Sequence, residues 1–334
     1  MSKNAALPPW IARQLQMLLA QRGHAWLLQG PSGLGQYTLA LEMARAWLCD
    51  KPSALGACGQ CGSCHAIDVR THADLRMLMP ETAMLERQWP LGEKAQADID
   101  DKKRKPSKEI RVEAMRDAIE FAQRTNAGGR GKVVLVFPAE RMNPVTANAL
   151  LKTLEEPPGD VRFVLASEAA QLLLPTIRSR CLAHAMAWPL ATEVMPWLSL
   201  QGLANEHAST WLRAAGGRPD DALALAASGH DAGLWSQLPR AVERGDAGAT
   251  QGMSPVQVVG VLHKLCHDLQ LVQQGAAPRF FESRDLPSGA RFTDLSQWGR
   301  DLSRATRTME HPFNPGLMIE ALLSQAKIAL NSRN

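Results

Sequence analysis

Four of the six cysteines in this chain of 334 residues lie close together. Cys49, Cys58, Cys61 and Cys64 have the spacing C-x8-C-x2-C-x2-C. A C-x2-C pair lets two thiolates bind one ion from a tight turn, and four thiolates complete a tetrahedral zinc shell. Because four protein ligands leave no open coordination position, we predict a structural zinc site. An iron–sulfur cluster and free buried thiols are the alternative interpretations.

A glycine-rich loop precedes the cysteines. Two of its glycines have the spacing of a Walker A loop, G-x-x-x-x-G-K-[ST], in which backbone N–H groups bind phosphate at a helix N-terminus. A glutamine stands where the lysine that reaches the phosphates should be, and a tyrosine stands where a small hydroxyl should hold Mg²⁺. The residues of this degenerate loop are Gly30, Gly33, Gly35, Gln36 and Tyr37.

The second metal element of such a site is also altered. A Walker B strand ends in acidic residues that hold Mg²⁺, but the strand expected over 132–137 ends in Phe137 and Pro138, and the nearest acid, Glu140, is displaced. We therefore predict that the isolated chain neither binds ATP tightly nor hydrolyses it. For the loop alone, an ordinary glycine turn in an unrelated α/β protein is the alternative.

The elements that position these residues alternate between strand and helix. Short connections between them indicate a parallel sheet with helices on both faces. The expected strands cover 25–28, 74–79, 132–137 and 161–166, and the expected helices cover 9–22, 36–48, 110–121 and 143–156. The polar, mixed-charge segment 81–108 is expected to be a solvated loop.

Beyond residue 186 the strand signal disappears and helical spacing continues. The expected helices cover 192–199, 205–215, 220–228, 255–275, 293–309 and 314–331. We therefore predict three domains: an α/β domain over 1–185 with the zinc module at 49–64, a small helical domain over 186–230, and a helical C-terminal domain over 231–334.

Composition narrows the class of protein. With 45% hydrophobic and 21% charged residues, the chain is not a disordered or low-complexity scaffold. Its formal net charge of +4 does not predict nucleic-acid binding by bulk charge, so any DNA contact requires a local patch or partners. Met1–Pro9 lacks the apolar region of a signal peptide, and no apolar run is long enough to span a bilayer. We expect a cytoplasmic protein.

Two further motifs carry a family resemblance. The run from Asn148 to Pro158 reads N-A-L-L-K-T-L-E-E-P-P, and the run from Thr176 to Cys181 reads T-I-R-S-R-C. Together they resemble the AAA+ clamp-loader ATPases, and the cysteine spacing is similar to that of bacterial DNA polymerase III clamp-loader subunits. The resemblance covers about residues 10–230. It implies an AAA+ fold with a helical lid over 186–230 and an oligomerising collar over 231–334.

The chain departs from the motor subunits of that family at both Walker elements. It also has Asp220, with Arg218 two residues earlier, where the family's second sensor has an arginine. The resemblance therefore implies a non-motor subunit. By its matching motif, Arg180 would act as an arginine finger on the ATP bound by an adjacent motor subunit, because a planar guanidinium can pair with several phosphate oxygens.

The partners implied by the resemblance are motor subunits of the gamma/tau type and a clamp-opening delta subunit, and, through the complex, the sliding clamp and primed DNA. The chain would belong to a DNA-directed DNA polymerase by association. The alternatives are an active AAA+ clamp-loader ATPase and a zinc-dependent nucleic-acid-binding adaptor.

Overall fold

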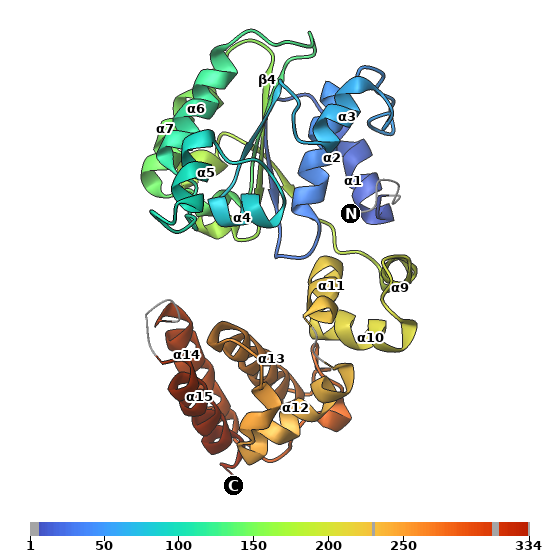
Figure 1. Ribbon diagram of the computed structural model, residues 1–334. Helices are drawn as coiled ribbons and strands as arrows, with labels where there is room; N and C mark the ends of the chain where they lie inside the picture. The colour runs from blue at the N-terminus through green and yellow to red at the C-terminus, as the bar shows by residue number, and fades with distance from the viewer. Residues whose placement is uncertain (1–6, 229–230, 309–313, 333–334) are drawn as a thin grey trace. The chain divides into compact units, whose positions relative to one another are not determined.

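A computed structural model describes residues 7–228, 231–308 and 314–332 of the chain. The chain forms two compact units, the first ending at Pro189 and the second beginning at Leu190 (Figure 1). The predicted boundary near residue 230 and the predicted helix end at Met309 lie at residues outside the described ranges. The division of the helical region into two domains stays a prediction.

The first unit is built on a parallel sheet, as the sequence predicts. Its five strands have the order β2-β3-β4-β1-β5. They are β1 (Ala25–Gln29), β2 (Leu75–Leu78), β3 (Lys132–Val136), β4 (Val161–Ser167) and β5 (Leu182–Ala185). In register, Leu27 of β1 lies beside Leu165 of β4 and Ala183 of β5. Each residue of β3 is buried, which explains the continuous apolar run from Val133 to Val136.

Helices cover both faces of this sheet (Figure 1). One face carries α1 (Pro9–Leu19), α2 (Gln36–Leu48) and α3 (Gly62–Asp68), and the other carries α4 (Glu81–Glu86), α6 (Val112–Gln123) and α7 (Pro144–Glu155). Between α4 and α6 lies α5 (Glu93–Asp100), which buries none of its residues. Two short segments, η1 (Ala139–Arg141) and η2 (Ala170–Leu172), follow β3 and β4. The start of α7 is fixed by Asn143, whose side chain accepts a hydrogen bond from the Thr146 N–H, and by Pro144 in the first turn.

The fifth strand is an element that the sequence patterns did not predict. β4 is followed by the short helix α8 (Pro175–Arg178) and then by β5, which pairs with β1 at one edge of the sheet. Three of the four residues of β5 are exposed, and Leu182 keeps 46% of its surface accessible. An edge strand of this kind lacks the apolar run that identifies a buried strand.

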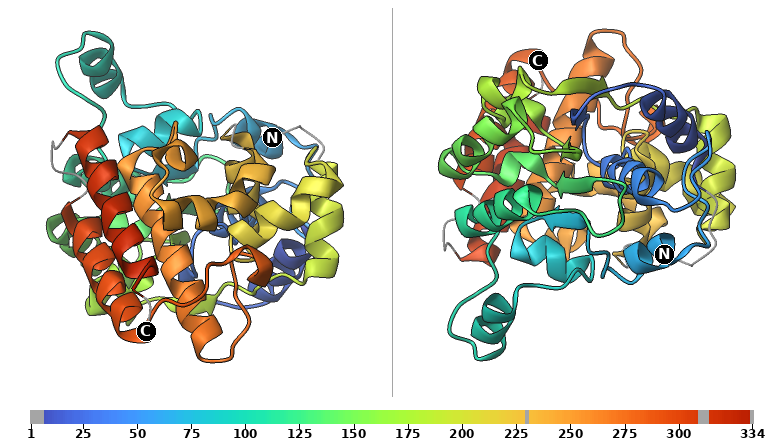
Figure 2. Two further views of the ribbon diagram at one scale, coloured as in Figure 1. Left: turned by 90° about the horizontal axis from the view of Figure 1, so that it is seen from below. Right: turned by 90° about the horizontal axis from the view of Figure 1, so that it is seen from above.

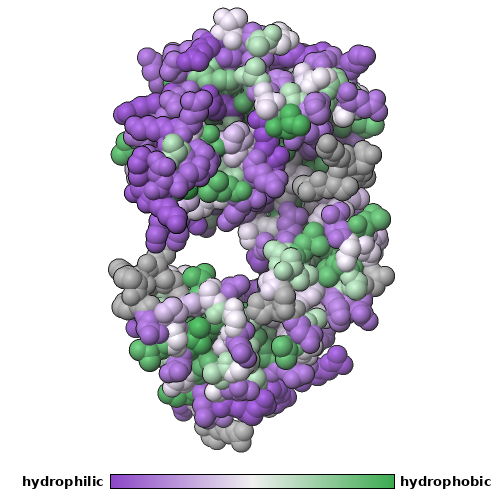
Figure 3. Space-filling model, viewed as in Figure 1, coloured by the Kyte–Doolittle hydropathy of each residue, from purple (hydrophilic) through white to green (hydrophobic). Residues whose placement is uncertain are grey.

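The expectation of a solvated loop over 81–108 is wrong, because this segment contains α4 and α5 and is held by a buried acid. Glu81 is 7% exposed and accepts hydrogen bonds from both Arg104 amino groups (2.5 and 2.8 Å) and from the Ser107 N–H (2.7 Å). Only α5 projects from the unit (Figure 2), and the surface over α4–α6 is mostly hydrophilic (Figure 3).

Replacing Glu81 with glutamine is expected to release this segment. Burial raises the pKa of Glu81, but Arg104, the Ser107 N–H and Arg111 outweigh it and leave the pKa below its ordinary 4.5. The stabilisation is therefore fully present above about pH 4.5 and is lost as the pH falls through the folded-state value. Limited proteolysis at neutral pH should cut the segment several-fold faster in Glu81→Gln than in the parent chain. Equal rates of proteolysis of the parent chain and the variant at neutral pH would show that Glu81 does not hold this segment.

The second unit is helical throughout the described residues. Its helices are α9 (Ala191–Leu200), α10 (Asn205–Ala214), α11 (Pro219–Ala227), α12 (Ala232–Arg244), α13 (Pro255–Gln273), α14 (Phe292–Thr308) and α15 (Pro315–Leu330), with short turns η3 (Ala247–Thr250) and η4 (Ser283–Asp285). Buried Asp268 of α13 accepts hydrogen bonds from the backbone N–H groups of residues 279–281, which fixes the chain after α13. Among the described residues, no helix combines the length and apolarity needed to cross a membrane.

Candidate functional site

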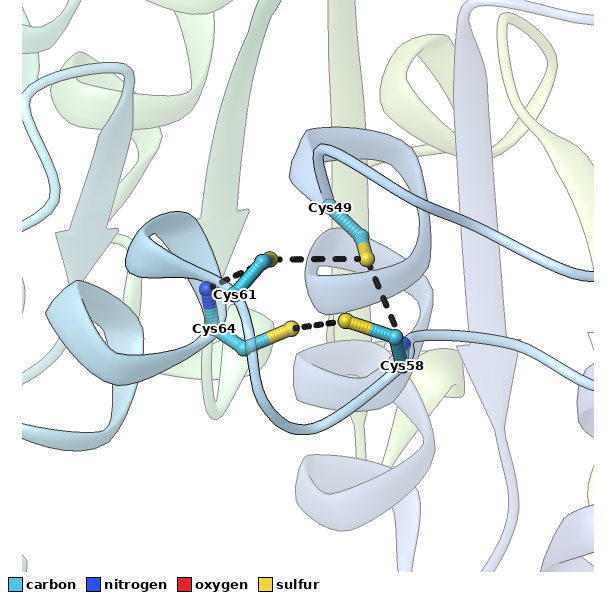
Figure 4. Close-up of side chains that lie close together, drawn as sticks. All are labelled: Cys49, Cys58, Cys61 and Cys64. Carbon is cyan, nitrogen blue, oxygen red and sulfur yellow. Dashed lines mark hydrogen bonds between the residues drawn. The ribbon is translucent and has the colours of Figure 1, made fainter.

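The four cysteines meet between α2 and α3. Their sulfur atoms all lie within 4.8 Å of one another, and Figure 4 shows the side chains pointing toward one another from the end of α2, from the following loop and from the start of α3. The Sγ atoms of Cys49 and Cys61 are 3.7 Å apart, and those of Cys58 and Cys64 are 4.0 Å apart. A Zn–S bond of about 2.3 Å gives a tetrahedron with S···S edges of roughly 3.8 Å. The donor set therefore fits a tetrahedral metal ion.

Backbone N–H groups surround the sulfurs. Cys49 Sγ accepts from the N–H groups of Lys51 (3.4 Å) and Cys58 (3.3 Å), and Cys61 Sγ accepts from the Cys64 N–H (3.4 Å). Hydrogen bonds from the Gln60 and Cys61 N–H groups lower the pKa of Cys58 to about 6, whereas burial raises the pKa of Cys64 to about 12. A divalent cation deprotonates such a buried thiol when it binds, because its charge compensates the thiolate.

The position of the cysteines separates them from the phosphate loop. Cys49 follows the last residue of α2, whereas the loop lies at the first residue of that helix. With a rise of about 1.5 Å per residue, the 13 residues of α2 hold the two features roughly 20 Å apart. His65 is exposed on α3 and is outside the group of close sulfur atoms. The arrangement suits a structural metal site.

The glycine loop that precedes α2 encloses the side chain of Gln36. Gly33 (φ 77°) and Gly35 (φ 89°) adopt the left-handed conformation, which favours glycine. Gln36 is 2% exposed, and its side-chain amide donates to the carbonyl oxygens of Gly30 (2.7 Å) and Pro31 (2.7 Å). The neutral amide is thus satisfied by the loop itself and brings no charge to a phosphate.

Tyr37 belongs to an aromatic and cationic cluster that the sequence did not predict. Its ring lies 5.4 Å from the ring of Phe137, and its hydroxyl accepts a hydrogen bond from the Trp89 indole N–H (2.7 Å). The Arg87 guanidinium lies 4.4 Å from the Tyr37 ring centre and 5.2 Å from that of Phe137. The two positions that hold Mg²⁺ in a Walker site are therefore linked here by an arginine side chain.

The nearest acid after β3 is bound elsewhere. The carboxylate of Glu140 accepts hydrogen bonds from the Ser167 hydroxyl (2.7 Å) and from the Glu168 N–H (3.2 Å). Both partners lie at the carboxyl end of β4, so Glu140 fastens η1 to that strand. The carboxylate of Glu140 therefore has a structural role in joining η1 to β4.

Arg180 and the glycine loop lie at opposite ends of the parallel strands. β1 enters the loop at its carboxyl end, whereas Arg180 precedes the amino end of β5, which runs parallel to β1. Its guanidinium is held by Glu155 at the end of α7, through Nε (2.6 Å) and Nη2, and by the Thr176 carbonyl oxygen (2.8 Å). The side chains of Arg180 and Glu155 are 31% and 48% exposed.

The predicted site residues therefore fall into three separate places: the sulfur cluster, the glycine loop and the arginine edge. Glu155, Arg87 and Trp89 are contacts that the sequence reasoning missed. Glu155 stands in the quoted L-L-K-T-L-E-E-P-P run, so its motif was visible, but no local pattern pairs it with Arg180. Arg87 and Trp89 lie 50 or more positions from Tyr37 in the sequence, and no spacing rule connects them.

The sheet order, the glycine loop after β1 and the helical second unit define an AAA+-type chain. A structure titled as a DNA polymerase III, gamma subunit-related protein from Thermotoga maritima shares the fold, with a TM-score of 0.50 and 15% identity; the match covers 96% of this chain and 100% of that chain. At this identity the likeness concerns the fold alone.

The family described as DNA polymerase III, delta subunit, matches residues 10–188. DNA polymerase III subunit delta' of Pseudomonas aeruginosa is 39% identical over 227 residues, which are 67% of this chain and 61% of that protein. Subunit delta' of Escherichia coli K12 is 34% identical over 223 residues, 65% of this chain and 60% of that protein. The chain belongs to this delta-prime family of clamp-loader subunits. It spans about three fifths of the length of these curated relatives.

Proposed function

We propose that this chain acts as the non-motor subunit of a DNA polymerase III clamp loader, in the cytoplasm. It assembles with motor subunits of the gamma/tau type and a clamp-opening delta subunit, whose ATP cycle opens the sliding clamp and places it on primed DNA. The chain contributes no ATP turnover of its own and is part of the polymerase holoenzyme by association. The observation that carries this proposal is the position of Arg180 at the amino ends of the strands, opposite the altered loop at their carboxyl ends.

That placement supports an action on a neighbour. All strands of the sheet run parallel, so a side chain at the amino edge cannot reach a nucleotide bound at the carboxyl edge of the same sheet. Exposed ion pairs such as Arg180–Glu155 contribute about 0–1 kcal/mol, so Arg180 can leave Glu155 at little energetic expense. In an assembly, Arg180 reaches the γ-phosphate of ATP bound by the adjacent motor subunit.

The remaining parts receive structural roles in this proposal. A zinc ion held by Cys49, Cys58, Cys61 and Cys64 fixes the chain between α2 and β2. The helices over 186–230 correspond to the lid of the nucleotide module, and those over 231–334 form the collar that joins the subunits. Reconstitution with motor subunits, delta subunit and clamp tests the whole proposal. A chain that does not enter the complex would refute it.

The altered loop predicts that the isolated chain does not bind Mg²⁺-ATP tightly. The double change Gln36→Lys and Tyr37→Thr should not restore turnover, because Phe137 and the Arg87 guanidinium still stand where the metal and its acidic ligands belong. Nucleotide titration by calorimetry and a phosphate-release assay measure both properties. Mg²⁺-dependent hydrolysis by the parent chain that is abolished by changing Gln36 would favour the active ATPase instead.

A further inference from the structure

The second unit carries a basic groove between α13 and α14. Its volume is about 570 Å³, and of the described residues ten line it, none of them acidic. Arg300, Arg304 and Arg307 of α14 form its charged wall, and α13 supplies His263 and His267 on the other side. No part of the proposed clamp-loader role above accounts for this groove.

The three arginines share one face of α14. Their spacing of four and then three residues places them on successive turns, and the opposite face is buried through Leu295 and Leu302. The Arg300 guanidinium is held by the neutral Gln297 side-chain oxygen (2.6 Å). Arg304 contacts Asp301 at 3.2 Å, yet 70% of its side-chain surface is accessible. The wall therefore presents a net positive charge to the groove.

The histidines add hydrogen-bonding groups to this charge. His263 lies 3.2 Å from the Thr306 hydroxyl, and burial lowers its pKa. The lowered pKa leaves His263 neutral at neutral pH, whereas the three arginines remain protonated at any physiological pH. Ser296 lines the same wall, and its hydroxyl can donate to anionic oxygens.

We propose that this groove binds the sugar–phosphate backbone of DNA. A helix rise of about 1.5 Å per residue spreads Arg300 to Arg307 over roughly 10 Å, and a DNA strand presents a phosphate about every 3.4 Å along the axis. The three guanidiniums thus extend along about three phosphate-to-phosphate intervals of one strand. The contact is independent of base sequence, because it involves the backbone alone.

An acidic protein segment fits the groove less well. Protein partners are usually anchored by aromatic or aliphatic side chains that fill an apolar pocket. Of the described residues that line the groove, Gly299 and Cys266 are its apolar members, and neither forms such a pocket. The charge has no accompanying apolar anchor, which favours a polyanion over a folded partner.

Binding by the full chain to a short labelled DNA of mixed sequence, single-stranded and duplex, tests the groove by fluorescence anisotropy. The variant Arg300→Gln/Arg304→Gln/Arg307→Gln should bind at least tenfold more weakly at low salt. The slope of log K against log salt should become shallower by about 2 for the single strand and about 2.7 for the duplex, as expected for three lost phosphate contacts. The DNA form, single-stranded or duplex, whose salt dependence changes by the expected amount is the form that the groove binds.

The matched control is Arg240→Gln/Arg244→Gln/Arg284→Gln, which removes equal charge from exposed positions of the same unit. This control should keep the parent slope. An equal loss of DNA affinity in the groove variant and in the control would overturn the proposal. Binding of polyglutamate that depends on the groove arginines, together with DNA binding that does not, would also overturn it. Thermal unfolding confirms that both variants fold. Assembly with motor subunits is measured separately, so failure of DNA binding is distinguishable from failure of the clamp-loader role.

Discussion

Replacing Cys64 with serine is expected to release the metal ion and to unfold the connection between α2 and β2. Cys64 is fully buried, and a serine hydroxyl does not replace a thiolate in a tetrahedral zinc shell. The three remaining sulfurs would then be held close together without the cation that compensates their charge. Because zinc binding to a structural site is coupled to folding, the loss should lower the free energy of unfolding by roughly 4 kcal/mol or more.

Elemental analysis and denaturant unfolding measure the two effects. The parent chain should contain one zinc ion per molecule, and the Cys64→Ser variant should contain almost none. Cys181→Ser, which changes a half-buried cysteine outside the cluster, should retain the ion. His65→Ala should also retain it, because His65 is exposed and lies outside the sulfur group. If the analysis found iron and the protein showed visible charge-transfer absorption, the four cysteines would hold an iron–sulfur cluster and the zinc prediction would be wrong.

Most of the sheet could be predicted from the sequence because its central strands are buried on both faces. β3 is the clearest case: a continuous apolar run marks a strand covered by helices on each side. β5 lies at an edge, and its sequence Leu-Ala-His-Ala carries no such run. Its place beside β1 depends on tertiary pairing, which a local pattern does not encode.

The candidate site divides in the same way between local and long-range features. The cysteine spacing encodes a cluster because the four thiols are close in sequence. The contact of Arg87 with Tyr37 and Phe137 depends on how α4 packs above the sheet, and the segment 81–108 offered only mixed charge as a signal. Glu81 shows why that signal misled: a charged residue at 7% exposure belongs to a buried ion network.

Parallel topology gives the proposed mechanism its geometry. The altered loop follows the carboxyl end of β1, and Arg180 precedes the amino end of β5. In the proposed assembly, Arg180 of this chain acts on the nucleotide loop of an adjacent motor subunit. Because the glycine loop and Arg180 lie at opposite ends of the strands, the two parts of the proposal can be tested by separate substitutions.

Arg180→Ala is expected to leave this chain folded and assembled while lowering the DNA- and clamp-stimulated ATPase of the complex. Folding should survive because an exposed ion pair contributes about 0–1 kcal/mol. An arginine finger supplied by a neighbour accelerates phosphoryl transfer by about 10³-fold or more, so turnover at the adjoining motor site should fall by that order. Steady-state and single-turnover ATP hydrolysis by the reconstituted complex measure the loss, together with clamp loading.

Three variants show whether the guanidinium itself is responsible. Arg178→Ala removes a neighbouring exposed arginine and should keep the parent rate. Arg180→Lys retains the charge without the planar fork and should recover only a small part of the rate. Glu155→Gln removes the intramolecular partner but leaves Arg180 in place, so ATPase should be maintained. If Arg180→Ala left both ATPase and clamp loading unchanged, Arg180 would have no part in the mechanism, whereas a loss confined to assembly would make it an interface residue.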